Sequence, residues 1–91
     1  MEFQKETNRI FAEDESGKVI AEVLFPEVRE GVVSIDHTFV DDSLRGQGVA
    51  GELMETVYEI LKEDGRKAEL VCGYAVKWYG DNPDKNDIVA G

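Results

Sequence analysis

The run LRGQGVAGEL, at residues 44–53, is the part of the sequence whose residue types best suit the binding of an anion. Gly46 and Gly48 allow the backbone to bend and to approach a ligand without a Cβ in the way. A helical pattern begins directly after them, so unpaired N–H groups and the positive end of the helix dipole point back toward the loop. The run predicts a pyrophosphate site that needs few basic side chains. The alternative is a glycine turn that only opens a helix.

Two residues, His37 and Cys72, are the candidates for proton transfer and covalent chemistry. Histidine is the side-chain type whose ordinary pKa lies near neutrality, so His37 is suited to accept a proton directly or through water. Its alternative role is that of a strand histidine packed with one nitrogen satisfied. Cys72 becomes a nucleophile if His37 lowers its pKa, and is otherwise a small buried apolar residue. The nucleophilic role of Cys72 requires elements that bring the two side chains close together.

The elements that must position these residues begin with β-rich runs separated by turn residues. The last long run places His37 in an apolar row with Val33, Ile35 and Phe39, because alternate residues of a strand share a face. The second run has apolar residues on both faces and is expected to be a central strand. Four strands are predicted, over residues 8–14, 18–25, 32–40 and 67–72.

Helical spacing predicts a long amphipathic helix over residues 48–64, with Gly65 as its stop, and a short aromatic helix over residues 74–79. The order strand, strand, strand, helix, strand, helix makes the third and fourth strands parallel, through a right-handed crossover. We therefore expect a mixed α/β (α+β) fold with helices packed on one mixed sheet. The tail from Asp81 is polar, and the pattern leaves open whether residues 88–90 dock or fray.

Composition narrows the class of protein. Ninety-one residues fit one compact domain, 1–91. A net charge of −10 with scattered basic residues argues against a nucleic-acid partner. No apolar run is long enough for a membrane span or a signal peptide, so we expect a cytoplasmic protein with no membrane partner, as a monomer or weak homodimer. One cysteine and one histidine without metal-ligand spacing predict no metal.

The pattern Arg45-x-x-Gly48-x-Ala50 matches the Gln/Arg-x-x-Gly-x-Gly/Ala signature of GCN5-related N-acetyltransferases, and it lies between a strand and an amphipathic helix, as in that family. Three further pieces occur in the matching order: IDHTFV before the loop, the lone Cys72, and the aromatic run YAVKWY with an Asn-Pro tail. Together they cover roughly residues 8–88. The sequence resembles a subgroup of minimal, single-domain members of this family.

That resemblance implies acetyl-CoA as co-substrate, lying in a wedge where the parallel third and fourth strands splay apart. Pantetheine would lie against Phe39 and Val40. A tyrosine, Tyr79 or Tyr74, would protonate the departing thiolate if it does not simply pack. The pyrophosphate would be held by the loop residues Arg45, Gly46, Gln47, Gly48, Val49 and Ala50.

The resemblance implies transfer of acetyl to an unidentified amine, a small molecule or a lysine-bearing peptide. Transfer would be direct, with His37 as base, or would pass through acetyl-Cys72. The alternative is a non-catalytic acyl-CoA sensor or interaction module, because full-length members carry additional helices and strands that shape the acceptor site. A plain structural partner without a ligand is the third reading.

Overall fold

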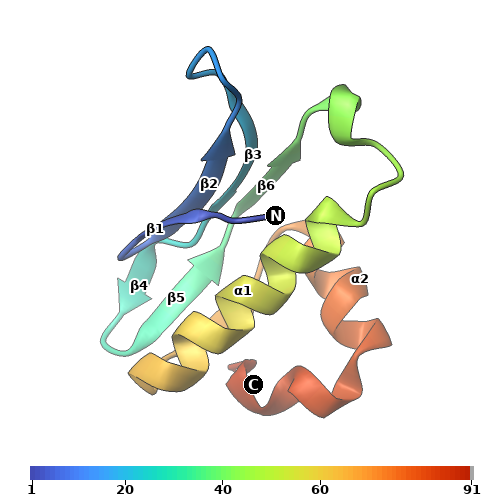
Figure 1. Ribbon diagram of the computed structural model, residues 1–91. Coiled ribbons are helices and arrows are strands. Elements are labelled where there is room, and N and C mark those ends of the chain that lie inside the picture. Colours follow the sequence, from blue (N-terminus) through green and yellow to red (C-terminus); the bar gives the residue numbers. More distant parts are fainter. Residues whose placement is uncertain (91) are drawn as a thin grey trace.

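Two small sheets form the framework of the computed structural model, which describes residues 1–90 (Figure 1). The antiparallel sheet has the order β1-β2-β3-β6, and the mixed sheet has the order β4-β5-β7, in which β5 and β7 are parallel. β3 lies between β2 and β6, which confirms that the second predicted strand is central. The strands are β1 (Gln4–Glu6), β2 (Arg9–Glu13), β3 (Val19–Leu24), β4 (Glu27–Arg29), β5 (Val32–Ile35), β6 (His37–Val40) and β7 (Lys67–Leu70).

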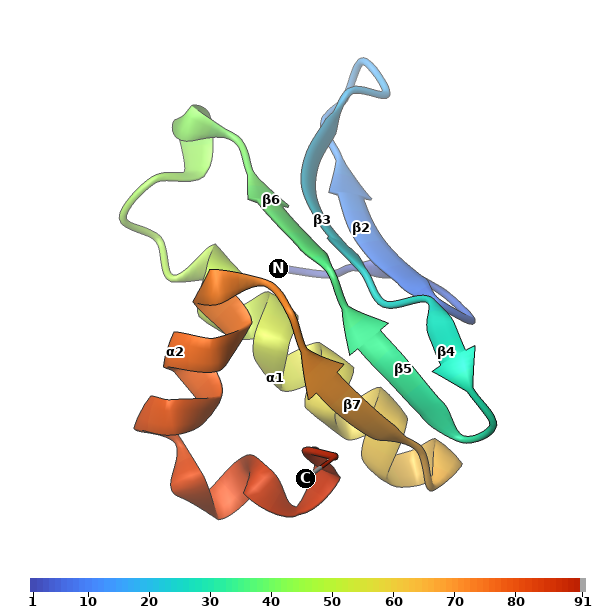
Figure 2. The same cartoon turned by 180° about the vertical axis from the view of Figure 1, so that it is seen from behind.

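The predicted strand 32–40 is in fact two strands that belong to different sheets. The chain leaves the β5–β7 pair at Asp36, whose N–H donates to Leu24 O at 3.1 Å, and continues as β6 beside β3. β6 and β7 consequently diverge (Figure 2). The splayed parallel pair expected from the sequence is confirmed in this form, with β5 and β7 as its paired part.

The interruption at Asp36 changes which side chains of β6 face the core. Thr38 and Val40 are half-buried, whereas His37 and Phe39 are exposed. The expectation that His37 shares an apolar row with Val33 and Ile35 is therefore wrong. The strand alternation on which it depended does not run through Asp36.

Helix α1 (Val49–Asp64) covers the sheets and contacts β3, β6 and β7 (Figure 1). It begins one residue later than predicted, after Gly48, and ends at Gly65, whose N–H donates to the carbonyls of the last turn. Both flanking glycines have positive φ, the backbone region that glycine adopts without strain. The helix forms because its apolar stripe is buried at Val49, Leu53, Met54, Val57 and Leu61.

The C-terminal segment docks on the domain, which answers the question left open by the sequence. After α2 (Gly73–Asp81) the chain forms a 3-10 helix, η2 (Pro83–Ile88), and Ile88 is only 2% exposed. Val89 forms a parallel bridge with Ala68 of β7, and Ala90 N donates to Ala68 O at 2.7 Å. Within residues 1–90, no helix has the length and apolar character needed to cross a membrane.

Candidate functional site

A pocket of about 260 Å³ lies where the end of β6, the following loop and the first turns of α1 and α2 meet. Six of the predicted binding residues contribute to its wall: Val40, Arg45, Gly46, Gly48, Val49 and Ala50. Five residues outside that prediction complete the wall: Asp41, Asp42, Leu44, Gly51 and Tyr74. The structure thus gathers most of the predicted loop around one concave surface.

The loop between β6 and α1 is shaped by short-range hydrogen bonds. Asp41 caps the 3-10 helix η1 (Asp42–Leu44), accepting from Ser43 N at 3.0 Å, and its carbonyl accepts from Leu44 N. Gln47 bonds within the loop, through its N–H to Leu44 O and through Nε2 to Ser43 O. Gln47 therefore shapes the loop rather than lining the pocket, and its predicted contact with a ligand stays a prediction.

Unpaired backbone N–H groups are concentrated at this pocket. Glu52 is the first residue of α1 whose N–H finds a helical acceptor, Gly48 O at 3.1 Å. Before it, and counting acceptors only within residues 1–90, no hydrogen bond is formed by the N–H groups of Gly46, Gly48, Val49, Ala50 and Gly51. These donors lie at the positive end of the α1 dipole. The pocket thus presents unpaired N–H donors and a positive helix end, the two features that favour binding of an anion.

The charged side chains at the rim largely neutralise one another. Arg45 Nη2 lies 2.6 Å from Asp42 Oδ1, and both side chains are strongly exposed. Hydrogen bonds from Ser43 hold the pKa of Asp41 below its usual value, and Lys18 Nζ lies 3.4 Å from the same carboxylate. The attraction for an anion therefore comes from the main chain and not from a basic cluster.

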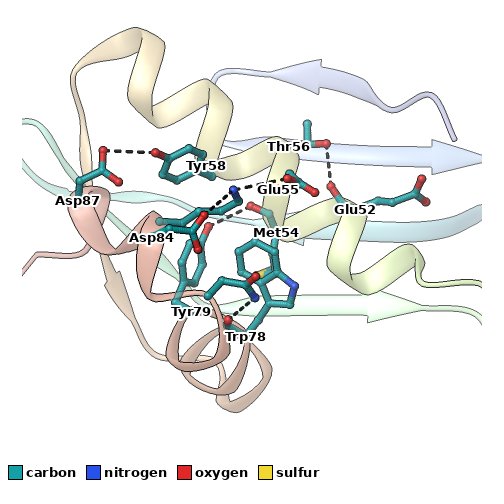
Figure 3. Close-up of polar contacts among 11 residues, drawn as sticks. Glu52, Met54, Glu55, Thr56, Tyr58, Trp78, Tyr79, Asp84 and Asp87 are labelled. Atoms are coloured by element: carbon teal, nitrogen blue, oxygen red, sulfur yellow. Dashed lines mark hydrogen bonds and ion pairs between the residues drawn. The ribbon is translucent and has the colours of Figure 1, made fainter.

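The two candidate tyrosines of α2 occupy different environments. Tyr79 is completely buried, and its hydroxyl donates to Met54 O at 3.0 Å (Figure 3). Burial raises its pKa, and its ring packs edge-on against Trp78 with centroids 4.9 Å apart. Tyr74 lines the pocket and is 37% exposed. The structure places Tyr79 in the core, which agrees with the packing alternative for this residue, and its predicted contact with the coenzyme stays a prediction.

Cys72 lies at the junction between β7 and α2, where β6 diverges from β7. It is the N-cap residue of α2, its thiol is half-buried, and its side chain forms no capping hydrogen bond. Sγ donates instead to Thr38 Oγ1 of β6 at 3.5 Å. Burial alone raises the pKa of this thiol. The Thr38 hydroxyl and the N–H groups at the start of α2 outweigh burial, so that the pKa lies below its ordinary value.

His37 and Phe39 project from the other face of β6. They lie opposite Leu24 and Glu22 of β3, respectively, and Phe39 is 36% exposed. Neither residue lines the pocket. Their predicted roles are a base for His37 and a pantetheine contact for Phe39. Both roles stay predictions, and both would be performed on the exposed face of β6.

Comparison with known proteins identifies the family. Residues 9–88 match the family described as GCN5-related N-acetyl-transferase. The chain belongs to this family.

Two solved structures support the GCN5-related N-acetyltransferase fold. An NMR structure of a GCN5-like protein from Staphylococcus aureus is 29% identical, covers 99% of this chain and 88% of that one, and superposes with a TM-score of 0.82. IAA acetyltransferase from Bacillus cereus, at 23% identity, covers 81% of this chain and 52% of that one with a TM-score of 0.64, and shows the fold alone.

The chain also resembles the protein NATD1 of Gallus gallus, at 35% identity over 63 residues. The matched region covers 69% of this chain and 57% of that protein. The human NATD1 is equally similar and is matched over 56% of its length. The chain therefore spans little more than half the length of these relatives.

Two of the residues at the site of this family member that were not found from the sequence are Thr38 and Gly51. Thr38 faces Cys72 because strand alternation is interrupted at Asp36. The available signal of that interruption was Asp36 itself, an acidic residue within a β-branched run. Gly51 lines the pocket from within α1. Its signal was a glycine inside a helical pattern, a residue type that helices disfavour.

Proposed function

We propose that this chain binds acetyl-CoA and transfers its acetyl group to an amine. The observation that carries the proposal is the set of five unpaired N–H groups between Gly46 and Gly51, which line a pocket at the start of α1. In a chain of the GCN5-related N-acetyltransferase family, such a set suits the pyrophosphate of coenzyme A. Acetyl-CoA enters as a co-substrate, and we propose no metal.

The residues present fit this ligand in both shape and charge. Gly46 and Gly48 have φ values of 80° and 72°, and no side chain there blocks the N–H groups. Val40, at the end of β6, provides apolar surface at the pocket for pantetheine, which would run along β6 toward Phe39. Because the donors belong to the main chain, a chain of net charge −10 is able to hold a polyanion.

Two chemical routes are compatible with the site, and the environment of Cys72 favours the covalent one. In that route the Cys72 thiolate attacks the thioester carbonyl, the coenzyme leaves as a thiolate and takes up a proton, and acetyl-Cys72 forms. The amine then attacks this second thioester, the Cys72 sulfur departs, and the proton of the amine passes to a base. The lowered pKa of Cys72 increases the thiolate fraction that begins the sequence.

In the direct route the amine attacks acetyl-CoA itself, and His37 accepts its proton through water. His37 is exposed on the far side of β6, a position from which an acceptor would approach. The acceptor is proposed to be a small amine or a lysine-bearing peptide. The absence of nucleic-acid and membrane partners, the monomeric or weakly dimeric state and the cytoplasmic location stay predictions.

A non-catalytic acyl-CoA sensor is the second candidate function. It is compatible with the site because the set of unpaired N–H groups concerns binding of the coenzyme and not transfer of its acetyl group. A sensor binds the coenzyme at the same amides and turns nothing over. The two functions therefore differ in whether the acetyl group is transferred after the coenzyme binds.

The proposal is tested by intact-mass analysis and calorimetry on the 91-residue chain. We expect acetyl-CoA to bind with heat release and to raise the melting temperature. On the covalent route, an acetyl adduct should appear in the chain and be missing from Cys72→Ala, and an amine acceptor should remove it. Binding without an adduct, together with thiol release in the presence of an amine, would support direct transfer. Binding with neither would support the sensor, and no binding would contradict both.

A further inference from the structure

Gly51 is the point at which α2 comes closest to the first turn of α1. A Cβ added to Gly51 would lie 3.3 Å from Trp78 Nε1 and 4.0 Å from the Tyr74 hydroxyl. Glycine is among the poorest residues for a helix interior, and Gly51 has no positive φ that would require it. The close approach of the two side chains therefore supplies the reason for a glycine at this position.

The two groups that approach Gly51 are both hydrogen-bond donors without a partner. Neither the Tyr74 hydroxyl nor the Trp78 indole N–H finds an acceptor in the part of the chain that the structure describes, residues 1–90. Tyr74 lines the pocket, and Trp78 is half-buried beside the core tyrosine Tyr79 (Figure 3). The unpaired N–H groups of Val49, Ala50 and Gly51 begin the same turn of α1. Tyr74 thus brings a donor of α2 into the wall of the pocket, and the Trp78 indole N–H lies beside Gly51, which belongs to the same wall.

We propose that the Tyr74 hydroxyl and the Trp78 indole N–H are anion-binding donors that complete the pyrophosphate site from α2, and that Gly51 is the positioning residue that admits them. This inference rests on the proposed binding of coenzyme A. It adds a second helix to a site otherwise built from one loop and the start of α1. The hydroxyl serves binding in this arrangement, and it does not deliver a proton to the thiolate.

A binding role and a proton-donor role for Tyr74 predict different measurements. A donor to the pyrophosphate stabilises bound coenzyme A whether or not an acetyl group is present, so its loss lowers affinity for free coenzyme A. A proton donor acts only during transfer, so its loss lowers turnover and leaves the affinity for coenzyme A unchanged. Calorimetry with free coenzyme A, which carries no acetyl group, separates the two.

The first test compares Tyr74→Phe with a matched control, Tyr58→Phe. Tyr58 lies on the opposite part of α1 and donates to Asp87 Oδ2 at 3.3 Å, away from the pocket (Figure 3). We expect Tyr74→Phe to weaken coenzyme A binding about tenfold, the usual effect of losing one hydrogen bond to a charged group. Tyr58→Phe should bind as the unsubstituted chain does.

The second test compares Gly51→Ala with Gly80→Ala. Gly80 lies in α2 with nothing within 4 Å of an added Cβ, so alanine there improves the helix without displacing a neighbour. We expect both variants to melt at or above the temperature of the parent chain. Only Gly51→Ala should bind coenzyme A more weakly, because its Cβ displaces the indole. Trp78 is the one tryptophan, so its fluorescence should respond to coenzyme A in the parent and in Gly80→Ala.

Unchanged affinity in Tyr74→Phe would overturn the anion-binding role of the hydroxyl, and unchanged affinity in Gly51→Ala would overturn the positioning role of the glycine. A Trp78 emission spectrum unaltered at saturating coenzyme A would overturn the role of the indole. If the parent chain itself shows no binding, the proposed function fails and the inference fails with it. That result is distinct from a parent that binds and a variant that binds equally well.

Discussion

The thiol of Cys72 and the hydroxyl of Thr38 lie 3.5 Å apart across the divergence of β7 and β6. They meet because the chain changes sheets at Asp36, which turns Thr38 inward, and because β7 ends just before the N-cap of α2. The pair links the two diverging sheets through one polar contact. It also gives the thiol a partner that favours its charged form.

Removing that partner should raise the pKa of Cys72. We expect Thr38→Val to shift the pH dependence of Cys72 alkylation by iodoacetamide toward higher pH, because the thiolate loses a hydrogen-bond donor. Thr38→Ser keeps the hydroxyl and should retain the profile of the parent chain. Rates followed by mass spectrometry measure this, and identical profiles for the valine and serine variants would show that the contact does not influence the thiol.

The loop prediction is tested at Gly48. A Gly48→Glu substitution puts a carboxylate among the N–H groups and forces a side chain into φ +72°, so we expect coenzyme A binding to be lost. Gly17→Glu is the matched control, since it has φ +89°, open space around its Cβ and a place in the β2–β3 turn. Both variants should lose stability similarly. Loss of binding in the control as well would show that strain, and not the site, is responsible.

Tyr79 should matter for stability and not for the ligand. Tyr79→Phe removes the buried hydrogen bond to Met54 O, which we expect to lower the free energy of unfolding by about 1 kcal/mol. For a domain of this size, that corresponds to a melting temperature lower by roughly 4–8 °C. Urea unfolding and calorimetry with coenzyme A measure the two properties. Full stability combined with weakened binding would show that Tyr79 acts on the ligand and not on the core.

Stability in acid should depend on the docked C-terminal segment. A hydrogen bond from Lys62 holds the pKa of Asp87 below its ordinary value of 3.8 in the folded chain. A lowered folded-state pKa stabilises the fold above the ordinary value, and this contribution is lost as the pH falls through the folded-state pKa. We expect Asp87→Asn to melt at a lower temperature at pH 7 and to differ little from the parent chain near pH 2. Equal differences at both pH values would contradict this account.

The sequence allowed prediction of those elements whose apolar periodicity is strong. Helix α1 was predicted within one residue, because its stripe ends in glycines that mark both termini. β1 and β4 were missed, since every residue in these three-residue strands is exposed and no apolar alternation identifies them. The break at Asp36 was missed for a different reason. A change of sheet depends on distant partners, β3 and β7, that a local pattern does not specify.

The site was predictable in part for the same reasons. The glycines at 46 and 48 carry their backbone requirement in the sequence, and the structure gives both of them a positive φ. Which aromatic residue of α2 faces the pocket was not predictable, because Tyr74 and Tyr79 both lie within one short aromatic run. Only the packing of α2 against α1 turns Tyr79 inward and leaves Tyr74 at the pocket.

A ligand site made of peptide groups holds its ligand only at short range, and this affects how fast coenzyme A is captured. Peptide dipoles attract within the pocket, whereas the chain as a whole carries a net charge of −10 and repels a polyanion from a distance. Dissolved ions screen that long-range repulsion. We therefore expect the association rate in stopped-flow measurements to increase with ionic strength, the reverse of the behaviour of proteins that capture phosphates with lysine and arginine.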